Sequence, residues 1–186
     1  MLAASLLLGE PPMKDVIRYA WGSSSLGEFL AAVTGRGLVA LEIGSDRPFM
    51  LNALRARLPQ ADLIESPSEL RDVVSEIVRV IDDPARQSQF HVPLDLRGTP
   101  YEIQVWSMLR SIPAGETTSY GTLAARMGTS DAREITKAIA ANPIAVLVPC
   151  HRVIKTDGSI SGYRWGVARK RELLAREQRG RPFELS

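Results

Sequence analysis

Apolar and polar positions alternate over three short segments near the start of the chain, a pattern typical of half-buried β-strands. These segments are residues 15–20, 27–33 and 37–44. The glycine- and serine-rich stretches between them, 22–25 and 35–37, predict turns. Short connections between successive strands favour antiparallel pairing. The first half of the chain is therefore expected to form a mainly antiparallel sheet.

Two helices and one further strand are predicted before residue 97. Residues 46–58 and 66–82 have helical periodicity, and it is clearer in the second segment. There, one face collects Leu70, Val73, Val74, Ile77 and Ile81. Residues 90–96 alternate as a strand does, and the run Arg97-Gly98-Thr99-Pro100 ends the pattern. We place a domain boundary at this break.

The second half is predicted to be mostly helical. The periodicity gives helices over 100–110, 119–127, 131–141 and 167–178. The short turn over 127–130 makes the second and third helices similar to a helix-turn-helix, the arrangement that presents a helix to a DNA groove. Ser130 is the expected N-cap of the third helix, and Asp131 is expected to complement its dipole.

Composition is that of an ordinary soluble globular protein, with 45% hydrophobic and 24% charged residues in 186. No apolar run approaches the length needed to cross a bilayer. The apolar start lacks a basic region before it, so we expect residues 1–13 to be an N-terminal tail rather than a secretion signal. A cytoplasmic location without membrane attachment is expected.

The chain contains one cysteine, Cys150, which excludes an internal disulfide and multi-cysteine zinc sites. The two histidines, His91 and His151, are far apart in the sequence, so no metal site is predicted. Charge is unevenly distributed. Residues 1–97 hold 10 Lys and Arg against 13 Asp and Glu, whereas residues 98–186 hold 13 against 8. The basic second half is where a polyanion is expected to bind.

Cys150 follows a buried-looking apolar run, 144–148, and precedes a histidine. A cysteine attacks carbon as the thiolate, so a nucleophilic cysteine needs a base, and His151 is the neighbour that can act as one. The proton can pass directly, if the chain bends, or through a bridging water. Glu172 and Glu177 are both candidates for the carboxylate that holds the imidazole. The alternative is that Cys150 is a small buried hydrophobic residue.

The sequence around Cys150 resembles the O6-alkylguanine-DNA alkyltransferases, also called methylated-DNA–protein-cysteine methyltransferases. The shared motifs run in order over some eighty residues: Thr118–Ala124, Arg133, Asn142-Pro143, Pro149-Cys150-His151-Arg152-Val153, Gly158–Gly166 and Leu173–Glu177. The second half is especially similar to Ada-type members, and this similarity includes Tyr163-Arg164-Trp165-Gly166. The first half fits more loosely, through residues 18–20 and 94–99.

This resemblance implies an α+β fold with two domains. Residues 14–97 are expected to form a ribonuclease-H-like small sheet domain. Residues 98–186 are expected to form a helical winged helix-turn-helix domain that carries the whole site. The implied activity is direct reversal of DNA damage, with one alkyl group moved from O6 of guanine to Cys150. O4 of thymine is a second substrate that the resemblance admits, and no cofactor is implied.

The resemblance also assigns catalytic roles. Cys150 is the alkyl acceptor, His151 deprotonates it through a water, and Glu177 holds His151. Tyr120 helps to rotate the phosphate of the nucleotide and donates a proton to N3 of the leaving guanine. Asn142 fixes the active-site turn. Because the product is a stable thioether, each molecule is expected to act once.

The remaining assignments concern DNA. The partner is double-stranded DNA that contains an alkylated guanine, bound by a monomer. Arg133 on the recognition helix fills the place of the flipped nucleotide, and Lys137 contacts a phosphate. The implied substrate pocket consists of Ile139, Val153, Tyr163, Arg164 and Trp165, with carbonyls of Cys150 and Val153 accepting from the exocyclic amine of the base. The backbone N–H of Arg164 is expected to donate to O6.

Three features of the recognition helix depart from the family pattern, which has small residues after the arginine. Here Glu134, Thr136 and Lys137 add charge and bulk, so we expect weaker or differently placed DNA binding. Trp165 stands where some members have glycine and is expected to narrow the pocket in favour of methyl groups. Two alternatives remain: a non-catalytic protein that recognises the lesion, against which Cys150 argues, and a transcription regulator that uses the helix-turn-helix.

Overall fold

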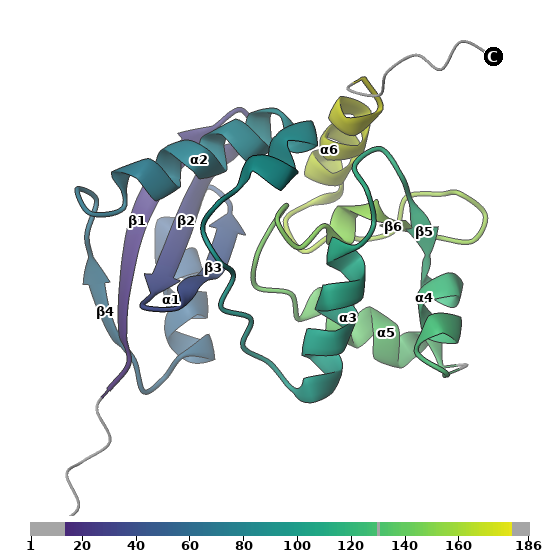
Figure 1. Cartoon of the computed structure of the whole chain (residues 1–186), viewed down its shortest axis with the longest axis horizontal. Helices are drawn as coiled ribbons and strands as arrows, with labels where there is room; N and C mark the ends of the chain where they lie inside the picture. Colours follow the sequence, from purple (N-terminus) through teal and green to yellow (C-terminus); the bar gives the residue numbers. More distant parts are fainter. Residues whose placement is uncertain (1–13, 130, 180–186) are drawn as a thin grey trace, which may run out of the picture.

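The computed structural model describes residues 14–129 and 131–179, which form a sheet-based half beside a helical half (Figure 1). The predicted tail, 1–13, lies outside the described residues. The first half contains, in order, β1 (Val16–Ser24), β2 (Gly27–Thr34), β3 (Gly37–Ile43), α1 (Arg47–Arg57), β4 (Asp62–Glu65), α2 (Arg71–Asp82) and the short 3-10 helix η1 (Pro84–Gln89). The mixed α and β composition agrees with the expected α+β class.

The strands form one sheet in the order β3-β2-β1-β4. The three long strands pair antiparallel, as predicted, and β4 adds to β1 in parallel. The sequence pattern did not predict β4, because four residues of mostly exposed character give no usable periodicity. The sheet therefore ends at β3 on one edge and at β4 on the other.

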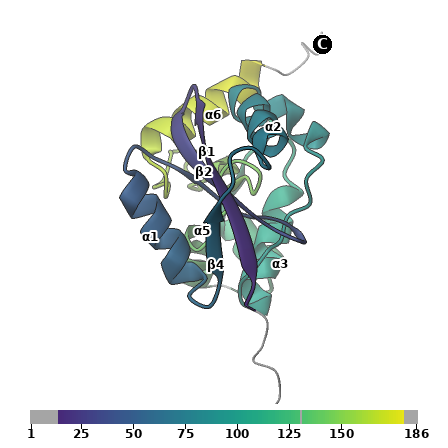
Figure 2. The same cartoon turned by 90° about the vertical axis from the view of Figure 1, so that its left-hand side faces the viewer.

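Each face of the sheet is buried by a different set of helices. Figure 2 shows α1 and α2 on opposite sides of the strands. On one face, Leu30 and Ala32 pack with Met50 and Leu54 of α1. On the other, a larger cluster of buried side chains joins the strands to α2 and continues into the helical half, including Trp106. The two halves thus share one apolar core, which fixes their relative position.

Strand β1 extends four residues beyond its predicted end. Gly22, predicted to lie in a turn, pairs with Phe29 across the β1–β2 ladder. A Cβ atom on Gly22 would lie 2.2 Å from the Phe29 ring, so glycine here makes room for an aromatic side chain within a strand. The prediction that 22–25 is the turn is therefore corrected, and the reversal occurs after Ser24.

The predicted strand over 90–96 is absent, and the segment makes only an isolated bridge between Leu94 and Leu38 of β3. Leu38 donates to the Pro93 carbonyl and accepts from the Asp95 N–H, both at 2.8 Å. Proline has no N–H, so a ladder cannot continue through Pro93. Helix α2 also begins later than predicted, at Arg71 rather than residue 66, because residues 67–70 form turns.

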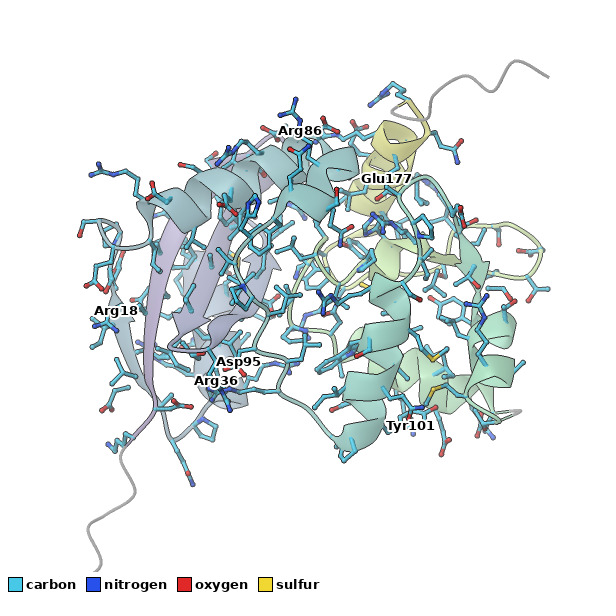
Figure 3. All side chains as sticks on the ribbon, in the orientation of Figure 1. Arg18, Arg36, Arg86, Asp95, Tyr101 and Glu177 are labelled. Carbon is cyan, nitrogen blue, oxygen red and sulfur yellow. The ribbon has the colours of Figure 1, made fainter. Side chains whose placement is uncertain are left out.

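Asp95 fastens this connecting segment to the sheet. Its carboxylate accepts from Thr34 at 2.8 Å and forms ion pairs with Arg97 at 2.8 Å and Arg36 at 3.1 Å. Figure 3 shows Asp95 and Arg36 side by side. Burial alone would raise the pKa of Asp95, but these hydrogen bonds and cations outweigh it and lower the pKa. The carboxylate therefore remains charged and holds the connection between the two halves.

The helical half follows the predicted order closely. Its elements are α3 (Pro100–Arg110), β5 (Thr118–Ser119), α4 (Tyr120–Arg126), α5 (Ala132–Ala140), the 3-10 turn η2 (Cys150–Arg152), β6 (Val153–Ile154) and α6 (Val167–Arg179). Helix α3 begins with a capping box between Thr99 and Glu102. The N-cap of α5 is Asp131, which accepts from the Arg133 N–H, and not Ser130, which lies outside the described residues.

Strand β3 connects the sheet directly to the active-site segment of the second half. The Leu41 N–H donates to the Pro143 carbonyl and the Leu41 carbonyl accepts from Ala145, both at 2.9 Å. The edge of the sheet is therefore covered rather than left open. Within residues 14–129 and 131–179, no helix is both long and apolar enough to cross a membrane.

Candidate active site

Asn142 organises the turn that leads to the cysteine. Its side chain is fully buried, and its amide nitrogen lies 3.2 Å from the Ile144 carbonyl and 2.9 Å from the Val148 carbonyl. Its oxygen accepts from the Ile144 N–H at 2.9 Å. The same amide nitrogen lies 3.3 Å from Cys150 Sγ. The residue predicted to fix the active-site turn thus contacts both the turn and the sulfur.

The turn held by Asn142 contains a strained residue. Val146 is buried with φ of 63°, a left-handed conformation that β-branched residues rarely adopt. Such a conformation costs on the order of 1–3 kcal/mol and persists only where its surroundings impose it. Here the buried apolar side chains of 144–148 and the Asn142 hydrogen bonds impose it, which fixes the backbone directly before Cys150.

Cys150 is the first residue of the short turn η2 and is only 4% exposed. Burial raises the pKa of its thiol to about 11, although the Asn142 hydrogen bond and the charges of Lys170 and Arg164 oppose that rise. The resting side chain is therefore a thiol. A base must remove its proton before the sulfur can attack carbon.

His151 and Glu177 form a fully buried pair, with His151 Nε2 2.7 Å from Glu177 Oε1. This contact decides between the two candidate carboxylates. Glu172 instead pairs near the surface with Arg176 at 2.8 Å and Arg179 at 3.4 Å. Figure 3 shows Glu177 on α6, the helix that brings this carboxylate to the turn η2.

Arg152 is a component of the site that the sequence did not single out. Its guanidinium is buried and contacts both Glu177 oxygens at 3.1 Å. It also donates to Gln87 at 2.7 Å and to the Ile112 carbonyl. Burial alone would raise the pKa of Glu177, but His151 and Arg152 together lower it to about 2. Glu177 is therefore a carboxylate at neutral pH.

Burial and the Glu177 carboxylate together set the protonation and the tautomer of His151. Burial lowers the pKa of His151 despite the hydrogen bond to Glu177, so the ring is neutral near pH 7. A neutral ring whose Nε2 faces a carboxylate must donate from Nε2, which leaves the lone pair on Nδ1. Among the described residues, Nδ1 has no hydrogen-bond partner. Nδ1 is therefore the basic nitrogen of the ring that can accept a proton.

The sequence allowed a direct hydrogen bond between Cys150 and His151. Within the part of the chain that the structure describes, this bond is not formed. The recorded partner of the sulfur is Asn142, and the recorded partner of the imidazole is Glu177. With no direct hydrogen bond between the two side chains among the described residues, proton transfer through a bridging water stays the prediction.

Cys150 opens into a pocket of about 770 Å³. Its walls come from the start of α4, one face of α5, the turn after β6 and the segment before α6: Tyr120, Gly121, Ala132, Thr136, Ile139, Ala140, Lys155, Thr156, Ser161, Gly162, Tyr163 and Arg164. The lining is mostly apolar with a few polar groups, as is usual for sites that bind a small planar ligand. Predicted pocket residues Ile139, Tyr163 and Arg164 all contribute to it.

Two predicted pocket residues do not line this cavity. Val153 is fully buried, and its carbonyl accepts from Lys170. Trp165 lies behind Tyr163, with ring centroids 5.2 Å apart, and its indole N–H donates to Glu42 at 2.6 Å. Trp165 is thus not among the side chains that line the pocket, and the expectation that it narrows the pocket stays a prediction. The indole occupies the interior because a carboxylate there accepts its N–H.

A chain of polar groups connects the pocket to a buried lysine. The Tyr120 hydroxyl lies 2.7 Å from Ser161 Oγ, and Lys170 Nζ donates to the same oxygen at 2.9 Å. Lys170 is fully buried, and burial lowers its pKa to about 8. Helical spacing is the signal that would have found it, since Lys170, Leu173 and Glu177 share the buried face of α6.

The residues expected to meet DNA lie on the exposed side of α5. Arg133 is exposed and pairs with Asp131 at 3.1 Å, and Glu134 and Lys137 are exposed on the same helix. The opposite face carries Ile135, Ala138 and Ile139, which are buried. An amphipathic helix with one charged face is thus displayed beside the mouth of the pocket.

Comparison with known proteins identifies the family. A family profile described as "6-O-methylguanine DNA methyltransferase, DNA binding domain" matches residues 100–179. The bifunctional transcriptional activator/DNA repair enzyme Ada of Escherichia coli is 41% identical over 162 residues, covering 87% of this chain and 45% of its own. The chain thus spans less than half of that relative.

Two further similarities extend over nearly whole chains. The inducible methylated-DNA–protein-cysteine methyltransferase of Bacillus subtilis is 37% identical over 155 residues, which covers 81% of this chain and 84% of its own. The crystal structure of Mycobacterium tuberculosis OGT in complex with DNA superposes with a TM-score of 0.71 at 33% identity, covering 87% and 93%. The chain belongs to the 6-O-methylguanine-DNA methyltransferase family.

Proposed function

We propose that the protein repairs DNA by moving an alkyl group from O6 of guanine to its own Cys150. The observation that carries the proposal is the position of the sulfur. Cys150 lines a pocket large enough for a base, next to a neutral imidazole that a buried carboxylate holds. A relative of similar length carries the name methylated-DNA–protein-cysteine methyltransferase.

The proposed base is Nδ1 of His151, acting through a water molecule. The thiol proton passes to this nitrogen as the sulfur attacks, and Glu177 stabilises the imidazolium that forms. A bond forms between Cys150 Sγ and the alkyl carbon, while the bond from that carbon to O6 breaks. The electron pair of the broken bond stays on the guanine. Proton donation from Tyr120 to N3 makes that guanine a better leaving group.

The product of this reaction is a thioether, which has no leaving group for water to displace. Nothing then restores the thiol, so each molecule acts once, and no cofactor takes part. The same chemistry extends to O4 of thymine as a second substrate. Because the reaction needs a reduced thiol, we place the protein in the cytoplasm. We also propose that it acts as a monomer.

The proposed partner is duplex DNA, held by a winged helix-turn-helix in which α5 is the recognition helix. A lesion inside a stacked duplex cannot reach Cys150, so the nucleotide must be flipped out at a cost of a few kcal/mol. Arg133 would fill the vacated place, and Lys137 would contact a phosphate. Arg133 must first leave Asp131, which costs little because the pair is exposed. The sheet half is proposed to be ribonuclease-H-like.

Titration of a duplex containing one O6-methylguanine with the purified protein tests this proposal. Residual lesion is measured by chromatography of the digested DNA. We expect one lesion to be lost per protein molecule and none with Cys150→Ser. Loss of many lesions per molecule, or loss that persists in Cys150→Ser, would contradict the proposal.

A further inference from the structure

We propose that Glu42, on strand β3 of the sheet half, is a specificity-determining positioning residue for the alkyl pocket. Through Trp165 and Arg164 it sets the position of the Tyr163 wall and thereby limits the size of the alkyl group that the pocket accepts. The inference rests on the proposed alkyl transfer. It assigns to the sheet half a role in the reaction that its sequence did not reveal.

Strand β3 is the edge of the sheet that touches the active-site half. At Leu41 its backbone bonds to the segment that precedes Cys150, through Pro143 and Ala145. The next residue, Glu42, contacts Arg164 and Trp165 of the segment that follows Cys150. Two successive residues of one strand thus hold both segments that flank the cysteine.

Glu42 is only 7% exposed and accepts hydrogen bonds from both neighbouring residues of the pocket segment. The Trp165 indole donates to Oε2 at 2.6 Å, and the Arg164 guanidinium donates to Oε1 at 2.9 Å. The Arg164 guanidinium also lies 5.8 Å from the Trp165 ring centroid. The buried Glu42 carboxylate therefore fixes the orientation of the Arg164 guanidinium and of the Trp165 indole.

The position of Trp165 is transmitted to the pocket by Tyr163. The two rings meet edge to face at a centroid distance of 5.2 Å, and the Tyr163 ring also meets the His151 ring edge to face at 6.4 Å. Tyr163 therefore contacts both Trp165 and the imidazole. Because close-packed interiors transmit displacements, a shift of Trp165 moves the wall that Tyr163 forms.

The charge of Glu42 also acts on a second arginine, Arg57. Arg57 of α1 donates to the carbonyl of Ala141, the C-cap of α5. Burial and the charge of Arg164 lower the pKa of Arg57, whereas the charge of Glu42 raises it. Without Glu42, Arg57 and Arg164 would repel each other, and Arg164 would be free to move toward solvent. Glu42 therefore holds Arg164 in place by charge as well as by hydrogen bonding.

Rates of alkyl transfer from duplexes with O6-methylguanine and O6-benzylguanine, measured in single turnover, test this inference. For Glu42→Leu we expect the benzyl-to-methyl rate ratio to rise about tenfold, because a looser wall admits the larger group. Glu42→Gln should give a smaller rise, since it keeps an acceptor for Trp165. Trp165→Phe removes the indole N–H but keeps a ring, and its effect should not add to that of Glu42→Leu.

The matched control is Glu28→Gln, which alters a carboxylate on β2 that pairs with Arg47 near the surface and should leave the ratio unchanged. An unchanged ratio in Glu42→Gln, Trp165→Phe and any folded Glu42→Leu, or an equal fall of both rates, would overturn the role of Glu42. If wild type and Glu28→Gln transfer neither group, the proposed function fails instead. Glu42→Gln and Trp165→Phe decide the question if Glu42→Leu does not fold.

Discussion

Substitution of His151 by glutamine is expected to slow methyl transfer by a factor of about 10²–10⁴. The thiol pKa of about 11 leaves little thiolate at neutral pH, so the reaction depends on a base. Glutamine keeps a donor for Glu177 but has no basic nitrogen. The measurement is the single-turnover rate of methyl transfer from duplex DNA, with thermal unfolding to confirm that the fold is retained.

Glu172→Gln is the matched control, because Glu172 lies on the same helix as Glu177 but pairs only with Arg176 and Arg179 among the described residues. Its rate should equal that of the wild type.

The pH dependence of the transfer rate adds a second measurement. Since burial lowers the pKa of His151, the base should stay neutral at pH 6.5 and lose activity only at lower pH. A His151→Gln rate within about threefold of wild type would show that the imidazole is not the base.

Substitution of Arg152 by methionine is expected to lower the free energy of unfolding by about 3–5 kcal/mol. The change leaves Glu177 buried without its permanent cation, and it also leaves Gln87 and the Ile112 carbonyl without a donor. For a domain of this size the melting temperature should fall by roughly 6–20 °C. Denaturant unfolding followed by circular dichroism measures the change.

The control for this variant is Arg86→Met, which breaks an ion pair with Asp83 in which both side chains are more than half exposed. Figure 3 shows Arg86 at the surface of the sheet half. The expected loss is under about 1 kcal/mol, as for other exposed ion pairs. If Arg152→Met lost no more stability than Arg86→Met, the buried cation would not be what stabilises the buried Glu177 carboxylate in the folded protein.

The sequence predicted correctly those elements whose ends are marked by capping residues, proline or glycine nearby in the chain. Helix α3 begins and ends where the sequence indicates, because Thr99, Pro100 and Glu102 form a capping box with proline in the first turn. The two errors have different causes. Gly22 lies in a strand because Phe29, on the neighbouring strand, packs against it. The prediction of a strand over 90–96 overlooked a local signal, because Pro93 inside the segment has no N–H for a ladder.

The candidate site shows the same division. Spacing and family resemblance named Cys150, His151, Asn142 and Glu177, and the structure brings these four together. The sequence pattern missed Glu42, because its hydrogen-bond partners lie more than 120 residues away. The alternation of apolar and polar residues along a strand does not indicate which distant residues a side chain contacts. It also misplaced Trp165, because the resemblance gives a position in a motif but not the direction of a side chain.

The departures of α5 from the family pattern remain predictions. Glu134 and Lys137 are exposed on the face that is proposed to meet DNA. A negative charge there opposes phosphate binding, and the neighbouring lysine favours it. The expectation of weaker or differently placed binding therefore depends on which of the two charges lies nearer the phosphates in the complex.

The central claim is that Cys150 itself receives the alkyl group, and the mass of the protein after the reaction tests it most directly. After incubation with duplex DNA containing O6-methylguanine, the intact protein should gain the mass of one methylene, roughly 14 Da, because a methyl group replaces the thiol proton. Fragmentation should place the added mass on Cys150, and Cys150→Ser should gain none. An unchanged mass in the wild type, or a methyl group on another residue, would contradict this account.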